Sequence, residues 1–83
     1  MTPFQYVLLK LKEESAEVIQ EASKVSQFGY DSISPKTNIS GREALHKELD
    51  DLLGCITLLN REYGLDWTPS HEATENKINK IKQ

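Results

Sequence analysis

The feature that most constrains the fold is a long stretch without a helix breaker, between Pro3 and Gly29. It is introduced by Thr2–Gln5, where Thr2 suits an N-cap, Pro3 the first helical position and Gln5 the return bond of a capping box. Gly29 suits a left-handed C-cap. The stretch therefore predicts one helix over Pro3–Phe28, about 39 Å long at ~1.5 Å per residue.

Apolar residues recur along this first helix at the three- and four-residue intervals of one helix face. They are Phe4, Val7, Leu8, Leu11, Val18, Ile19, Ala22, Val25 and Phe28. Glu14, Glu17 and Glu21 lie between the two apolar blocks, on or beside the same stripe. Carboxylates that border a packing stripe differ from those of a fully solvated face, so we expect them to lie near another element.

A second long helix is predicted over Gly41–Tyr63. Ser40-Gly41-Arg42-Glu43 reads as its capping box and Gly64 as its C-cap. This is the more apolar of the two helices, with Leu45, Leu49, Leu52, Leu53, Ile56, Leu58 and Leu59. The loop over Gly29–Ile39 either folds over a ligand or is a mobile connector. Two long helices joined by a short loop are expected to pack antiparallel.

A third helix is predicted from Thr68-Pro69 to about Lys82, after a short turn. It is weakly amphipathic and basic, so it has little core of its own. We expect an all-α fold, with a long antiparallel helical hairpin plus a C-terminal helix, in a single domain over residues 1–83. Oligomerisation would complete it as a four-helix-bundle type of assembly.

The composition favours this oligomer, as a homodimer or homotetramer. A chain of 83 residues with 37% hydrophobic residues buries only about 60–65% of its unfolded surface and is marginal alone. A net charge of −3 without a basic stripe argues against nucleic-acid binding. The single cysteine, Cys55, permits no internal disulfide, which fits a reducing cytoplasm. Neither a membrane span nor a signal peptide is visible, so no membrane partner is expected.

Two acidic segments carry the chemistry, Glu13-Glu14-Ser15-Ala16-Glu17 and Glu48-Leu49-Asp50-Asp51. Helical spacing puts Glu14 and Glu17 on one face, and likewise Glu48 and Asp51. If the two helices pack side by side, four carboxylates converge and repel one another. A hard cation removes this repulsion, and an all-oxygen set suits Mg²⁺, with Mn²⁺ as a possible substitute.

The two segments resemble the Glu-Glu-x-x-Glu and Glu-x-x-Asp motifs of the MazG-like all-α nucleoside triphosphate pyrophosphohydrolases, and they match every fixed position. The resemblance extends from about Leu8 to the C-terminus. It implies a Mg²⁺-dependent hydrolase that cuts the α–β phosphoanhydride of an NTP or dNTP, giving the monophosphate and pyrophosphate. The chain has no phosphate-binding Gly-x-x-x-x-Gly-Lys-Ser/Thr loop and no nucleophilic Ser/His or Cys/His arrangement, which favours water as the nucleophile.

The resemblance also implies roles for single residues. The metal ligands would be Glu14, Glu17, Glu48 and Asp51. The residue that takes a proton from water would be Glu13 or Glu17. The residues that contact substrate phosphates would be Asn76, Lys77 and Lys80, where Lys80 stands at a position that is often Arg. Lys24, two turns after Glu17, is a further candidate for a phosphate contact.

Plainer interpretations stay open. The acidic pairs can be a solvated face that forms ion pairs with Lys10, Lys12 and Lys47, and the C-terminal lysines can complement the helix dipole. Phe28, Tyr30 and Trp67 can stack on a base or anchor an interface. The same fold also admits dUTP/dCTP or phosphoribosyl-ATP pyrophosphohydrolysis. A non-catalytic helical oligomerisation module is the alternative from another class.

Overall fold

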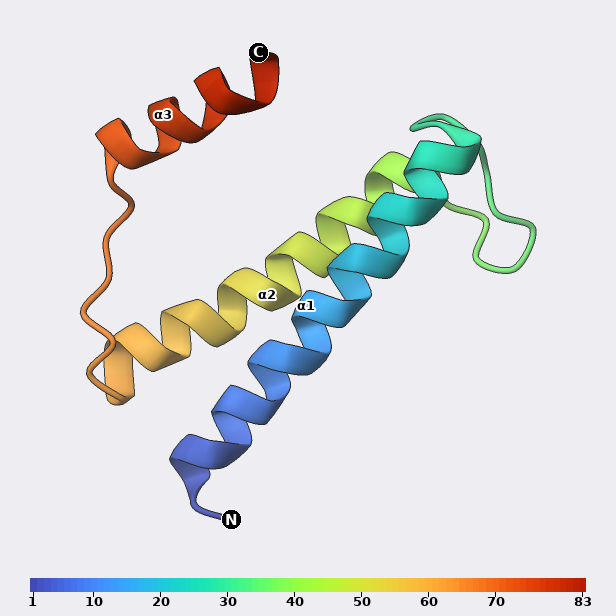
Figure 1. Cartoon of the computed structure of the whole chain (residues 1–83). Helices are drawn as coiled ribbons and strands as arrows, with labels where there is room; N and C mark the ends of the chain where they lie inside the picture. Colours follow the sequence, from blue (N-terminus) through green and yellow to red (C-terminus); the bar gives the residue numbers. More distant parts are fainter.

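The computed structural model describes all residues from Met1 to Gln83 and contains three helices and no strand. Helix α1 spans Pro3–Phe28, α2 spans Gly41–Glu62 and α3 spans His71–Lys82. Helices α1 and α2 form a long hairpin, and α3 stands apart from it at the end of an extended segment (Figure 1). The predicted all-α class and the hairpin with an added C-terminal helix are confirmed.

The hairpin is antiparallel, because the start of α1 lies beside the end of α2. The rings of Phe4 and Tyr63 stack there with centroids 5.7 Å apart. Val7 and Leu59 are the two buried residues of the chain, with 7% and 3% of their surface exposed. The best-buried part of the hairpin is therefore its open end, while the acidic residues lie further along its length.

The start of α1 follows the prediction, and its end differs in detail. Both bonds of the capping box form: the Gln5 amide donates to Thr2 Oγ1 over 3.0 Å, and the Thr2 amide donates to Gln5 Oε1 over 2.8 Å. Gly29 has a positive φ of +87°, but its ψ of 168° lies outside the left-handed helical region that we predicted. Gly29 thus ends α1, and the backbone continues from it in an extended direction.

Helix α2 begins at the predicted residue and ends one residue earlier than predicted. Ser40 Oγ accepts a bond from the Glu43 amide over 3.1 Å, but the reciprocal Glu43 bond of the predicted capping box is absent. The helix ends at Glu62 with Tyr63 as its C-cap, and Gly64 follows with a φ of +67°.

The hairpin closes at a point where only glycine fits. A Cβ atom on Gly41 would lie 2.8 Å from the carbonyl oxygen of Gly29 and 3.2 Å from Val25 Cγ2. Such a contact with backbone is closer than real Cβ atoms adopt, so a side chain would force α1 and α2 apart. Gly41 therefore sets how closely the first turn of α2 approaches the last turn of α1.

The connection between α1 and α2 is held to α2 by hydrogen bonds. The amides of Gly41 and Arg42 donate to the carbonyls of Ser32 and Tyr30 over 3.1 and 2.9 Å. Arg42 also pairs with Asp31 over 2.7 Å, and its guanidinium lies 5.0 Å from the centroid of the Tyr30 ring. The connection therefore forms a cap over the closed end of the hairpin, which argues against the mobile-connector interpretation.

Helix α3 begins at His71, two residues after Pro69, where the helix was predicted to start. Ser70 is its N-cap, and Ser70 Oγ accepts a bond from the Ala73 amide over 3.1 Å. The prediction was wrong because a stronger cap follows the proline: Ser70 satisfies a free amide, and Glu72 adds a negative charge to the first turn.

The predicted short turn between α2 and α3 is an extended segment that is fixed at one point. The side-chain amide of Asn60 donates to the Trp67 carbonyl over 2.9 Å and accepts from the Trp67 amide over 3.0 Å. Beyond this clasp the chain leads to α3, which packs against neither α1 nor α2. The last helix is thus attached to the hairpin through the chain alone.

The single chain exposes more surface than a compact fold does. Its radius of gyration is 15.4 Å, whereas a compact chain of this length has about 12 Å. It exposes 6715 Å², whereas a compact 9.5 kDa chain exposes about 5,000 Å². The exposed large apolar residues on the helices include Phe4, Tyr6, Ile19, Phe28, Leu49, Leu53, Leu58, Ile78 and Ile81. None of the three helices combines the length and apolar character needed to span a membrane.

Candidate metal centre

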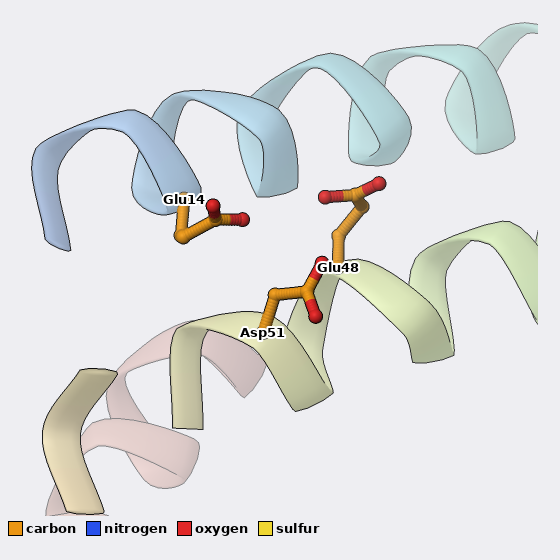
Figure 2. Close-up of side chains that lie close together, drawn as sticks. All are labelled: Glu14, Glu48 and Asp51. Atoms are coloured by element: carbon orange, nitrogen blue, oxygen red, sulfur yellow. The ribbon is translucent and has the colours of Figure 1, made fainter. Parts of the chain in front are cut away.

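Three carboxylates meet in the middle of the hairpin. Glu14 comes from α1, while Glu48 and Asp51 come from α2, one turn apart on one face. One carboxylate oxygen of each lies within 4.8 Å of the others. Figure 2 shows the three side chains directed into the space between the two helices. The predicted convergence of the two acidic motifs is therefore present for these three residues.

No basic side chain neutralises this cluster. The ion pairs of the molecule are Lys10–Glu13, Lys24–Glu21 and Arg42–Asp31. None includes Glu14, Glu48 or Asp51, and neither Lys12 nor Lys47 forms an ion pair. The interpretation of these carboxylates as an ion-paired surface is therefore not supported by their contacts.

The electrostatics of Glu48 reflect this crowding. Partial burial raises the pKa of the Glu48 carboxyl above its ordinary value, and the charge of Glu17 raises that pKa further. Asp51, Glu14 and Glu21 act on it in the same direction. The folded hairpin thus disfavours the charged form of Glu48, and a bound cation would reverse that preference.

Cys55 borders the cluster on the side away from the α1–α2 loop. It lies one turn after Asp51 on α2 and is half-buried. Burial raises the pKa of the Cys55 thiol, the charges of Glu14 and Asp51 raise it further, and Lys10 lowers it. A thiol kept protonated beside carboxylates is a poor nucleophile. Cys55 therefore acts as a small packing residue at the edge of the site.

The two residues predicted to activate water differ in position. Glu13 is half-exposed and its Oε2 lies 3.1 Å from Lys10 Nζ, outside the three-carboxylate cluster. Glu17 is exposed and outside the cluster as well, but it lies close enough to raise the pKa of Glu48. Of the two, only Glu17 adjoins the cluster.

The predicted phosphate contacts are further away. Lys24 Nζ lies 3.3 Å from Glu21 Oε1 on α1, two turns beyond Glu17. Asn76, Lys77 and Lys80 are exposed on α3, and nothing in the single chain brings α3 to the hairpin. Of the predicted phosphate contacts, Lys24 is therefore the one that lies on the hairpin, and the other three belong to α3, which stands apart from it in Figure 1.

Sequence reasoning assigned Glu21 no part in the metal site and named Lys10 only as an ion-pair partner, whereas their charges act on Glu48 and Cys55 respectively. The signal was available in both cases. Glu21 follows Glu17 by four residues and Lys10 precedes Glu14 by four, which is the spacing of neighbours on a helix face.

Comparison of the chain with protein-family models, with curated proteins and with solved structures found no match.

Proposed function

We propose that the protein is a Mg²⁺-dependent nucleoside triphosphate pyrophosphohydrolase, which converts an NTP or dNTP to the monophosphate and pyrophosphate. The observation that carries the proposal is the unneutralised cluster of Glu14, Glu48 and Asp51, with oxygens within 4.8 Å of one another. The same residues occupy fixed positions of the two motifs that resemble the MazG-like family. The proximity of the three carboxylates and the motif pattern thus both support Glu14, Glu48 and Asp51 as metal ligands.

The donor set fits a hard cation. It consists of carboxylate oxygens from two facing helices, it has no basic partner, and it raises the pKa of Glu48. Glu14, Glu48 and Asp51 would hold the metal, and a rotamer change would let Glu17 join them. A bound Mg²⁺ would supply positive charge for the triphosphate and make water more acidic.

The chain's own residues then have separate roles. Glu17, which adjoins the cluster without belonging to it, is the group we assign to accept the proton of the attacking water. We assign Glu13 no such role, because it is directed to Lys10. Lys24 would exchange its contact with Glu21 for a substrate phosphate, since a phosphate carries more charge than a carboxylate.

We further propose that the functional unit is at least a dimer. One chain exposes roughly 1,700 Å² more than a compact chain of its mass, and a standard interface buries about 800 Å² on each partner. Leu49 is nearly half exposed, and Leu53 and Ile19 are more than half exposed, so the hairpin offers apolar side chains to such an interface. Lys77 and Lys80 would then reach the cluster of a second copy.

The reaction is tested by hydrolysis of NTPs and dNTPs in ¹⁸O-labelled water, with mass spectrometry of the products. Attack at the α-phosphorus places the label in the monophosphate. Label found in pyrophosphate alone would indicate attack at the β-phosphorus. Release of a diphosphate and orthophosphate would overturn the reaction class, and the preferred base would emerge from the same screen.

A non-catalytic oligomerisation module is the second candidate, and the exposed apolar residues of both hairpin helices favour it. Thermal melts separate the two. A metal and nucleotide site raises the melting temperature with Mg²⁺ plus nucleotide by mass action, while a module without a site gains nothing. Light scattering at micromolar concentration tests the assembly in either case, and a stably folded monomer would contradict it.

A further inference from the structure

A cavity of about 410 Å³ lies at the closed end of the hairpin, between the last turns of α1, the first turn of α2 and the connection between them. Its apolar lining includes Phe28, Ile33 and Ile39, and its polar lining includes Lys24 and Lys36. Gly41 and Ala44 line the cavity from α2, and the small side chain of Ala44 leaves space there. The volume falls in the range of small-molecule sites in proteins.

The cavity and the carboxylate cluster lie on the same face of each hairpin helix. On α1, Glu14, Glu17, Glu21, Lys24 and Phe28 follow one another at intervals of three and four residues. On α2, the same intervals relate Gly41, Ala44, Glu48, Asp51 and Cys55. Each series is one helix face. The antiparallel packing sets the two faces against each other, with carboxylates in the middle and the cavity at the loop end.

Glu21 links the two parts. It lines the cavity, and its charge raises the pKa of Glu48 in the cluster. Ala44 lines the cavity one turn, about 6 Å, before Glu48 on α2. The order along the hairpin is therefore carboxylates, then the lysine at position 24, then the apolar wall.

The cavity offers apolar side chains and hydroxyls that suit a ring and a sugar, beside the charged side chains of Glu21, Lys24 and Lys36. The first amides of α2, which would otherwise attract an anion, are occupied: Gly41 and Arg42 donate to loop carbonyls and Glu43 to Ser40. Apart from these charged side chains, the wall combines apolar side chains with the hydroxyls of Ser32, Ser34 and Thr37. Phe28 is 62% exposed, so its ring is free to stack.

We propose that this cavity holds the base and sugar of the nucleotide whose phosphates lie at the carboxylate cluster. The inference rests on the proposed function and adds where the nucleoside binds. Phe28 stacks on the base, Ala44 leaves room for it, and Lys24 contacts the phosphates between the two parts. The competing occupant is an apolar side chain of a second copy, and the experiment separates the two.

The test is a titration with nucleoside 5′-monophosphates in the absence of metal. Binding is monitored by NMR through the backbone amide signals of the ¹⁵N-labelled full chain. We expect saturable shifts at Ile33, Gly41 and Ala44, and none with ribose 5-phosphate, which lacks the base. Phe28→Ala and Ala44→Leu should each weaken binding about tenfold or more, the loss expected for one base stack. Gln20→Ala is the control, because Gln20 is exposed on α1 and does not line the cavity.

Three results would overturn the inference. The first is the absence of nucleotide-dependent shifts at the cavity, the second is equal shifts with ribose 5-phosphate, and the third is unchanged binding in Phe28→Ala. Cavity signals that respond to dilution and not to nucleotide would assign the space to a second copy. Titration with Mn²⁺ alone, followed by line broadening at Glu48, reports separately on the proposed metal site. The two proposals can therefore fail independently.

Discussion

The hairpin and α3 follow the same rules of helix formation and differ in what holds them in place. The hairpin helices are fixed at both ends, by the Phe4–Tyr63 stack at one and by the close approach of Gly41 to Gly29 at the other. Helix α3 has a well-formed N-cap at Ser70 and no packing contact with either hairpin helix. Capping thus defines where a helix begins, while packing decides where it lies.

The difference separates the candidate site into a part that one chain assembles and a part that it does not. The carboxylates have their positions set by two packed helices, so their mutual distances follow from the fold of one chain. The lysines of α3 have no such constraint. Substitutions in the two parts should therefore differ in the size and the kind of their effects.

The largest effect is expected from the hairpin carboxylates. Glu14→Gln, Glu17→Gln, Glu48→Gln and Asp51→Asn should each lower kcat by about 10³-fold or more, because each removes a charge that we propose to hold the metal or to accept the proton. Circular dichroism should retain the helical signal. Glu75→Gln on α3 is the matched control and should leave turnover near wild type. Near-normal turnover in Glu48→Gln would refute the metal assignment.

A smaller effect is expected from the lysines of α3. The double variant Lys77→Ala/Lys80→Ala should raise KM about tenfold with less change in kcat, because charge on the phosphates is no longer neutralised. Mixing this variant with Glu48→Gln and refolding them together should recover about a quarter of wild-type activity in a symmetric dimer if the lysines act on a second copy. No recovery would mean that α3 serves its own hairpin.

The closed end of the hairpin should respond to a single methyl group. Gly41→Ala should lower the free energy of unfolding by about 1–3 kcal/mol, because its Cβ would overlap the Gly29 carbonyl. Gly54→Ala is the matched control: a Cβ there meets nothing within 4 Å, and it should gain about 0.5–1 kcal/mol from helix propensity. Urea unfolding followed by circular dichroism measures both, and equal stability of the two variants would contradict the contact.

The smallest effect is a pH dependence of the metal-free protein. The pKa of Glu48 is raised in the folded hairpin from an ordinary value of 4.5. Its contribution to stability is therefore fully present below that value and is lost as the pH rises through the raised pKa. Relative to Glu48→Gln, the wild type should lose stability over this window, and apo melting temperatures of both proteins test it. A parallel pH response of the two proteins would argue against crowding of the carboxylates.

Local signals in the sequence predicted most of the fold. The cap at Thr2 and the uninterrupted stretch to Phe28 predicted both ends of α1 correctly, and the cap at Ser40 predicted the first residue of α2. The error at the start of α3 came from two competing caps, which differ by bonds that only the folded turn reveals. The placement of α3 could not be predicted, because α3 makes no packing contact with α1 or α2 that would fix it.

The candidate site was predictable where helical spacing and helix packing determine the positions of the side chains. Helical spacing and antiparallel packing were enough to bring Glu14, Glu48 and Asp51 together. The direction of the Glu13 side chain was not predictable from helical spacing, because Lys10 competes for its carboxylate. The cavity beside Ala44 depends on how the α1–α2 connection folds, and that follows from long-range backbone bonds instead of a local motif.

The Asn60–Trp67 clasp has a consequence for how the chain assembles. By fixing Trp67 to the last turns of α2, it leaves only the short segment Thr68–Ser70 as a pivot for α3. A short linker restricts the directions that a terminal helix can take and strains any packing of that helix onto its own hairpin. Short, strained linkers of this kind favour domain swapping, in which two chains exchange the helix. The clasp would therefore favour packing of α3 on a second chain over packing on its own hairpin. The stability of such an exchanged dimer would depend on protein concentration.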